Sequence, residues 1–199
     1  MPVSSSDLTV GPADVYWALF TDATSAEPAT PTTAAAAGWT YFGATDGGLK
    51  LTMGVKYVQQ YVDQSGFPLA SSLDQATTHA SVPLTKVNSV NLKALLNGGT
   101  ITTTGTGATA LDAFEPVADL VANDPVYFKL LIRGKAPVSD TGFPNQKRDI
   151  FLRKVLQTAD LVYSADKTNK SMFSGVDVMC HFVSNSIAPW GMKTMNATA

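Results

Sequence analysis

Residues 38–57 read GWTYFGATDGGLKLTMGVKY, and this stretch decides the fold. From Leu49 to Tyr57 every second residue is apolar, which is the two-residue period of a strand with one buried face. The triplet Asp46-Gly47-Gly48 predicts a tight turn, because glycine reaches positive φ without a Cβ clash. We therefore expect a hairpin between the two segments that flank this triplet.

The rest of the chain adds further strands to this pattern. Alternating or continuous apolar positions predict strands at residues 15–20, 77–82, 126–133, 147–156 and 176–183. In the clearest of these, Val126, Phe128, Leu130 and Ile132 point one way. Few charged residues and many small or β-branched ones also favour strands and turns. The composition and the pattern together predict a mainly β fold.

One short helix interrupts the strands. Residues 90–96 have helical spacing, with Leu92, Leu95 and Leu96 as one apolar stripe. Ser89 can cap its first turn, and Gly98 suits the left-handed position after its end. A helix of about two turns is not stable alone, so it must lie against the sheet and cover a core.

A chain of 199 residues can form one domain with a sizeable core. We expect a single domain over residues 1–199, with a polar N-terminal arm at residues 1–14 and a C-terminal arm at residues 189–199. Residues 60–74 predict a long, turn-rich loop. Loops of this length often carry function.

Charge and cysteine content exclude several classes of protein. Fourteen basic and 16 acidic residues give a net charge of −2, which disfavours a conventional nucleic-acid binder. Cys180 is the only cysteine, so no disulfide can form within the chain. The first residues, Met1 to Asp7, lack the basic start and apolar core of an ordinary secretory signal, and no run reaches the roughly 20 apolar residues that span a bilayer. We expect cytoplasmic folding and no membrane insertion.

The histidines and acidic loop residues do not form a convincing reactive site. His79 and His181 lie on two predicted strands, each opposite the apolar face, which favours solvent-facing or interface positions over metal binding. Asp63 and Asp74 bracket the long loop and are explained as turn formers. The sequence therefore predicts no catalytic, cofactor-binding or metal-binding residue, no cofactor and no enzymatic activity.

Two basic pairs, Lys147-Arg148 and Arg153-Lys154, lie along one predicted strand. Two pairs do not make a continuous basic path for DNA. We expect them to pair with acidic residues of a neighbouring subunit.

Three landmarks follow one another in a recognisable order. The first runs from Trp39 to Leu51, the second is Asp63-Gln64-Ser65 with Pro68, and the third is the leucine-rich helix before Asn97-Gly98. This order resembles the major tail tube proteins of long-tailed bacteriophages with non-contractile tails. The resemblance covers about a third of the chain.

The resemblance implies a β-sandwich or β-barrel that assembles into hexameric rings stacked into a tube. The tube would be the conduit for viral DNA, and it would meet a tape measure protein and the tail terminator and tip proteins. It also implies a place in the virion tail after synthesis in the bacterial cytoplasm, and contact of the loop at residues 60–74 with the adjacent ring.

Unpaired edge strands suit such an assembly, because their amides and carbonyls invite another chain and a head-to-tail ring satisfies them. Two alternatives remain open: the inner tube of a contractile tail or injection machine, and a β-sandwich adhesion or decoration module.

Overall fold

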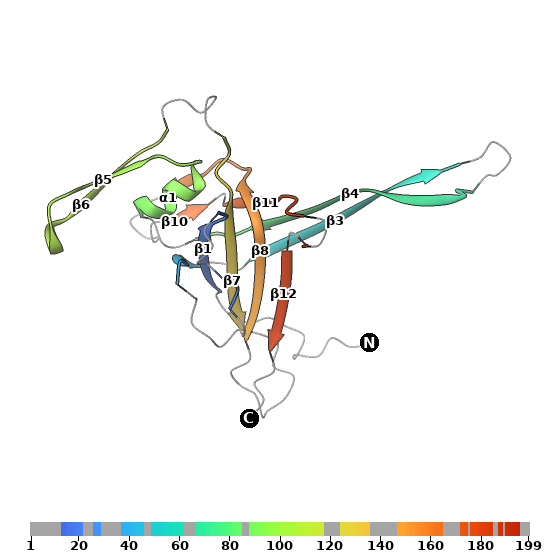
Figure 1. Ribbon diagram of the computed structural model, residues 1–199, viewed down its shortest axis with the longest axis horizontal. Coiled ribbons are helices and arrows are strands. Elements are labelled where there is room, and N and C mark those ends of the chain that lie inside the picture. The colour runs from blue at the N-terminus through green and yellow to red at the C-terminus, as the bar shows by residue number, and fades with distance from the viewer. Residues whose placement is uncertain are drawn as a thin grey trace.

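The computed structural model describes residues 13–21, 26–28, 37–45, 49–61, 67–84, 88–117, 124–135, 147–164, 172–174, 176–184, 187–188 and 190–195. These residues form an eight-stranded sheet, two separate two-stranded sheets and one short α-helix (Figure 1). The predicted mainly β class with one short helix is confirmed. The large sheet is open and does not close into a barrel.

The elements follow one another as β1 (Asp14–Leu19), β2 (Thr40–Ala44), β3 (Lys50–Gln60), β4 (Ala70–Ser81), α1 (Ser89–Leu95), β5 (Thr100–Thr104), η2 (Gly107–Thr109), β6 (Leu111–Glu115), β7 (Phe128–Lys135), β8 (Lys147–Gln157), β9 (Val162–Ser164), β10 (Met172–Ser174), β11 (Asp177–Cys180) and β12 (Trp190–Met195).

The large sheet has the strand order β2-β1-β7-β8-β11-β4-β3, and β12 pairs with β8 beside this path. Its strand pairs are antiparallel. An isolated antiparallel bridge joins Thr45, just after β2, to Leu84, just after β4. The two smaller sheets are the hairpin β5–β6 and the pair β9–β10.

One face of the large sheet carries the hydrophobic core. Alternate residues of its central strands meet there, and Val15, Phe128, Leu130, Leu152, Val155 and Val178 are completely buried. The predicted inward set of β7 is confirmed for Phe128, Leu130 and Ile132. Full burial of such side chains contributes roughly 1.5–3 kcal/mol each. Strands β1, β7 and β8 therefore form the stable centre of the body.

Helix α1 covers this core, as predicted, through Leu95, which is buried, and Leu92, which packs partly buried against it, but not through Leu96. Asn91, Ala94 and Leu95 are its buried residues, while Leu96 is exposed. The N-cap is Asn88, whose Oδ1 accepts a hydrogen bond of 2.7 Å from the Asn91 amide, so the predicted cap at Ser89 is wrong by one residue. Asparagine is as good a cap as serine, which explains the shift.

Asn91 joins the helix to the sheet. Its Oδ1 accepts from Trp17 Nε1 at 3.0 Å, and its Nδ2 donates to the Phe42 carbonyl at 2.9 Å. Because Asn91 is fully buried, these bonds satisfy polar groups that have no access to water. The helix position therefore depends on a polar contact with β1 and β2 that the apolar pattern did not reveal.

The predicted hairpin around Asp46-Gly47-Gly48 does not form. Strand β2 pairs with β1, and strand β3 pairs with β4, so the two flanking segments belong to opposite ends of the sheet. The triplet itself lies outside the described residues. A turn signal fixes a local change of direction but does not determine which strands pair.

Three predicted boundaries also change. Asp14, expected in the N-terminal arm, begins β1, and residues 1–12 lie outside the described residues. The predicted loop at residues 60–74 is strand from Ala70 onward. The predicted C-terminal arm at residues 189–199 contains β12, which pairs with β8. The segment of β4 from Ala70 onward and the strand β12 are both held by backbone hydrogen bonds to a neighbouring strand, which an apolar pattern does not report.

Candidate assembly surfaces

Strands β3 and β4 form a long hairpin that leaves the body of the molecule, hereafter the arm (Figure 1). The ladder runs from Lys50 opposite Ser81 at the base to Gln60 opposite Ala70 near the tip, with a bulge after Lys56. The outer edge of β3 has no strand partner among the described residues. This outer edge is eleven residues long, and the amides and carbonyls of its alternate residues point away from β4, where another chain can pair with them.

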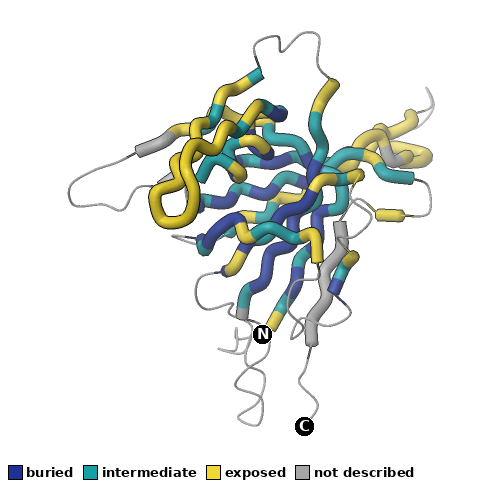
Figure 2. Tube along the Cα trace, turned by 60° about the vertical axis from the view of Figure 1, so that its left-hand side comes forward, coloured by how far each residue is buried: buried dark blue, intermediate teal, exposed yellow. Residues whose placement is uncertain are grey.

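The face of the arm that continues the core is apolar. At the base, Ala80 and Thr78 are buried in the body. Further out on the same face, Met53, Val55 and Tyr57 are 53%, 57% and 61% exposed. The expectation that this strand has a buried face holds only at its base, because the described side chains further out are exposed (Figure 2). This apolar arm face is defined by Met53, Val55, Tyr57 and Ala76.

The opposite face of the arm is polar. Lys56 Nζ lies 3.0 Å from Asp74 Oδ2, and both side chains are exposed. Beside this ion pair, Gly54 lacks a side chain, and a Cβ built there would lie 2.9 Å from Thr77 Oγ1. The result is an open notch of 270 Å³ lined by Gly54, Val55, Lys56, Gln75 and Thr77, hereafter the arm notch.

The hairpin β5–β6 is a second projection, at the other end of the molecule's longest axis (Figure 1). Most of its residues are exposed, and Leu111 is 73% exposed (Figure 2). Its charged residues are both acidic, Asp112 and Glu115. Asp112 Oδ1 accepts a hydrogen bond of 2.7 Å from Thr103 Oγ1 within the hairpin. The molecule thus ends in an amphipathic arm on one side and an acidic hairpin on the other.

A buried ion pair crosses the centre of the sheet on the face opposite the core. Arg133 of β7 donates to both carboxylate oxygens of Asp149 of β8, at 2.8 and 2.7 Å. The hydrogen bond to Asp149 raises the pKa of Arg133, and burial of the Tyr16 hydroxyl nearby raises the pKa of that tyrosine. Removing only one partner of such a buried pair strongly destabilises a fold, because the remaining charge is left buried and uncompensated. Its role is therefore structural.

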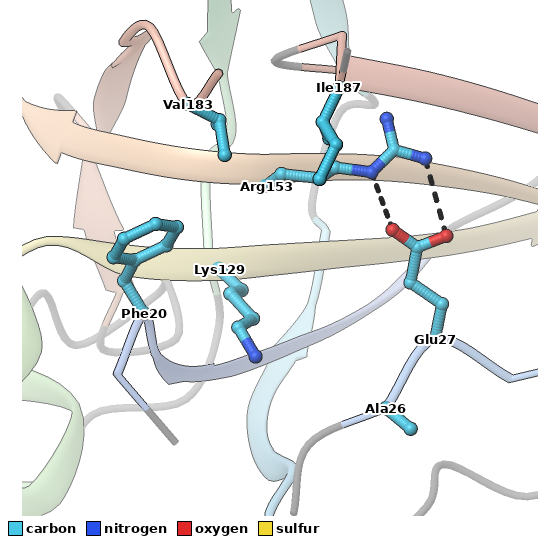
Figure 3. A pocket seen from close by; sticks show the side chains of 7 residues that line it. All are labelled: Phe20, Ala26, Glu27, Lys129, Arg153, Val183 and Ile187. Carbon is cyan, nitrogen blue, oxygen red and sulfur yellow. Dashed lines mark hydrogen bonds and ion pairs between the residues drawn. The ribbon is translucent and has the colours of Figure 1, made fainter. Parts of the chain in front are cut away.

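Arg153 of β8 ties together two distant segments (Figure 3). Its guanidinium binds the Glu27 carboxylate at 2.6 and 3.3 Å and donates to the Ala188 carbonyl at 2.9 Å. The prediction that this basic pair meets a neighbouring subunit's acid is wrong for Arg153, whose partner is Glu27 of the same chain. The side chain lies at a pocket of 350 Å³.

The second half of that basic pair, Lys154, is also engaged within the chain. Its Nζ lies 4.3 Å from the ring centre of Tyr127 and 5.4 Å from that of Phe20. The Tyr127 ring in turn meets the His181 ring at 5.1 Å. Burial, with a smaller contribution from Lys154, lowers the pKa of His181, so this ring is neutral near neutral pH.

The other side chains that were considered and rejected as reactive groups are scattered. His79 Nδ1 lies 3.9 Å from Asp177 Oδ1, and both side chains are half-exposed. Asp74 belongs to the arm, whereas Asp63 lies outside the described residues. Burial raises the pKa of the Cys180 thiol to about 12, which makes it a poor nucleophile. Those of these residues that the structure describes do not meet in one site.

The described residues contain neither a metal-binding cluster nor a membrane-spanning helix. No group of three or more His, Cys, Asp or Glu side chains there could hold a metal ion. No helix in this part of the chain is both long and apolar enough to cross a membrane.

No protein-family model matches the chain, and no curated protein matches it in sequence.

Proposed function

We propose that this chain is a structural subunit that assembles with copies of itself into stacked rings, forming the tail tube of a long-tailed bacteriophage. The tube is the conduit through which viral DNA passes into the host. The observation that carries this proposal is the apolar arm face, which continues the hydrophobic core beyond the body and remains exposed. The order of the three sequence landmarks supports the same function.

The apolar arm face is difficult to reconcile with a chain that acts alone. A two-stranded hairpin is only marginally stable in water, and exposed apolar stripes promote association. Burying Met53, Val55 and Tyr57 against another subunit would give each side chain the burial energy that it lacks in the single chain. In the stacked assembly, the arm packs on a subunit of the neighbouring ring.

The free edge of β3 supplies a second means of association. Its amides and carbonyls along Lys50–Gln60 can pair with a strand from another copy. A contact between two different surfaces of identical subunits is head-to-tail, and it generates a ring when the rotation closes. The low net charge of the chain suits a wall past which DNA must move without binding.

A lysine placed on the apolar arm face tests this proposal. Val55→Lys should abolish or strongly weaken self-association in sedimentation velocity, because the charge would have to be buried in the interface. Val162→Lys is the matched control: Val162 is 53% exposed in β9, outside the arm and the β5–β6 hairpin. Unchanged assembly of the Val55→Lys protein would contradict the proposal.

A further inference from the structure

The arm notch has the chemistry of a carboxylate-binding site. Lys56 offers an ammonium group, Gln75 an amide and Thr77 a hydroxyl around the same opening. All three can donate hydrogen bonds to a negatively charged oxygen, and charge-assisted bonds of this kind are the strong ones. The Asp74 carboxylate already lies 3.0 Å from Lys56 Nζ. Because the pair is exposed, it leaves the ammonium open to a second acceptor.

Gly54 lets the Thr77 hydroxyl lie close over the strand backbone at this site. A side chain at this position would project toward Thr77 Oγ1, with its first carbon only 2.9 Å away. A glycine inside a strand weakens the strand, and it often marks a place where another chain approaches closely. The notch is therefore a break in the row of side chains on this face of the arm, and the Thr77 hydroxyl lies at it.

The β5–β6 hairpin carries the matching groups. Asp112 and Glu115 are exposed carboxylates, and no basic residue lies between Thr100 and Glu115. The two projections lie at opposite ends of the molecule, so the hairpin cannot reach the notch of its own chain (Figure 1). In a second copy placed head-to-tail, the acidic hairpin faces the arm.

We propose that the arm notch receives an acidic side chain of the β5–β6 hairpin from a second copy of this chain. The contact rests on the proposed self-assembly and identifies which surfaces meet. It is heterologous, because a notch on one copy meets a hairpin on the next, so it extends the assembly in one direction. Electrostatic complementarity then fixes the register of successive copies.

Zero-length carbodiimide coupling of the assembled protein tests the contact. This reagent joins an ammonium and a carboxylate that touch, and mass spectrometry identifies the joined peptides. Coupling of Lys56 to Asp74 serves as the positive control within one chain, since those groups already lie 3.0 Å apart. Coupling of Lys56 to Asp112 or Glu115 is the expected result. Because the two projections lie at opposite ends of the chain, that product must join two copies.

Charge reversal provides a second, independent measurement. Lys56→Glu alone, or Asp112→Lys with Glu115→Lys, should weaken self-association about tenfold, the effect of about 1.4 kcal/mol. Combining all three substitutions in one chain should restore association to within about threefold of the original. Circular dichroism of each variant checks that the fold is retained.

The outcomes separate this inference from the proposed function. If the protein assembles but Lys56 couples only to Asp74 and charge reversal has no effect, the contact is wrong and the tube proposal stands. If the unmodified protein stays monomeric at all concentrations, both are wrong.

Discussion

The inner and outer halves of β4 share one hydrogen-bonded ladder but lie in different environments. Near the body, Thr78 and Ala80 are buried, whereas Gln75 and Ala76 on the arm are exposed. Backbone pairing with β3 continues through both halves. Pairing alone therefore does not decide which part holds the fold together. Substitutions in the body should lower the free energy of unfolding, and substitutions on the arm should change association.

The largest expected difference is between two aromatic residues. Phe128→Ala in the body should lower the free energy of unfolding by about 3–5 kcal/mol, because it opens a cavity beside Trp17. Tyr57→Ala on the arm should change it by less than about 0.5 kcal/mol. Urea denaturation of the monomeric protein measures both. Equal losses would show that the arm is part of the folding core.

The next comparison is between the buried ion pair Arg133–Asp149 and the exposed ion pair Lys56–Asp74. Asp149→Ala leaves the buried Arg133 guanidinium without its carboxylate and should cost about 3 kcal/mol or more. Asp74→Ala removes the exposed partner of Lys56 and should cost about 0–1 kcal/mol. Thermal denaturation at two salt concentrations separates the pairs further, because only the exposed pair is screened. An Asp149→Ala protein as stable as the original would contradict a structural role for the buried ion pair.

A smaller effect is expected where the helix meets the sheet. Asn91→Ala leaves the Trp17 indole and the Phe42 carbonyl without their partner, which should cost about 2 kcal/mol. Asn88→Ala removes only the cap and should cost about 1 kcal/mol. Urea denaturation of both variants tests the order, and a larger loss for Asn88→Ala would reverse it.

The smallest effect concerns pH. Because the pKa of His181 is lowered in the folded protein from its ordinary 6.5, the unfolded chain binds the proton more readily. Stability should therefore be complete above pH 6.5 and fall as the pH drops from 6.5 toward the lowered value. His181→Gln should flatten this slope, whereas His79→Gln, at the base of the arm, serves as the control. A slope that is unchanged in His181→Gln would assign the pH dependence to other groups.

The same contrast between body and arm explains which features the sequence predicts. In β7, alternate apolar residues lie in the core, so the pattern and the burial agree at Phe128 and Leu130. Along the arm, Val55 and Tyr57 follow the same pattern, yet both side chains are exposed. Periodicity reports which residues share a face, not whether that face is covered.

Other features depend on partners far apart in the sequence. Arg153 binds Glu27 across 126 positions, and Trp17 binds Asn91 across 74. No local pattern marks such pairs, and the buried Arg133–Asp149 pair is likewise visible only after β7 and β8 align. The arm notch has one signal in the sequence, the glycine at position 54 within an alternating strand.

Electron microscopy of the purified protein at increasing concentration is the decisive test of self-assembly. We expect hollow rings that stack into tubes, with the apolar arm face of each subunit covered by the next copy in a reconstruction. Single particles at every concentration, with Met53, Val55 and Tyr57 still exposed, would contradict it.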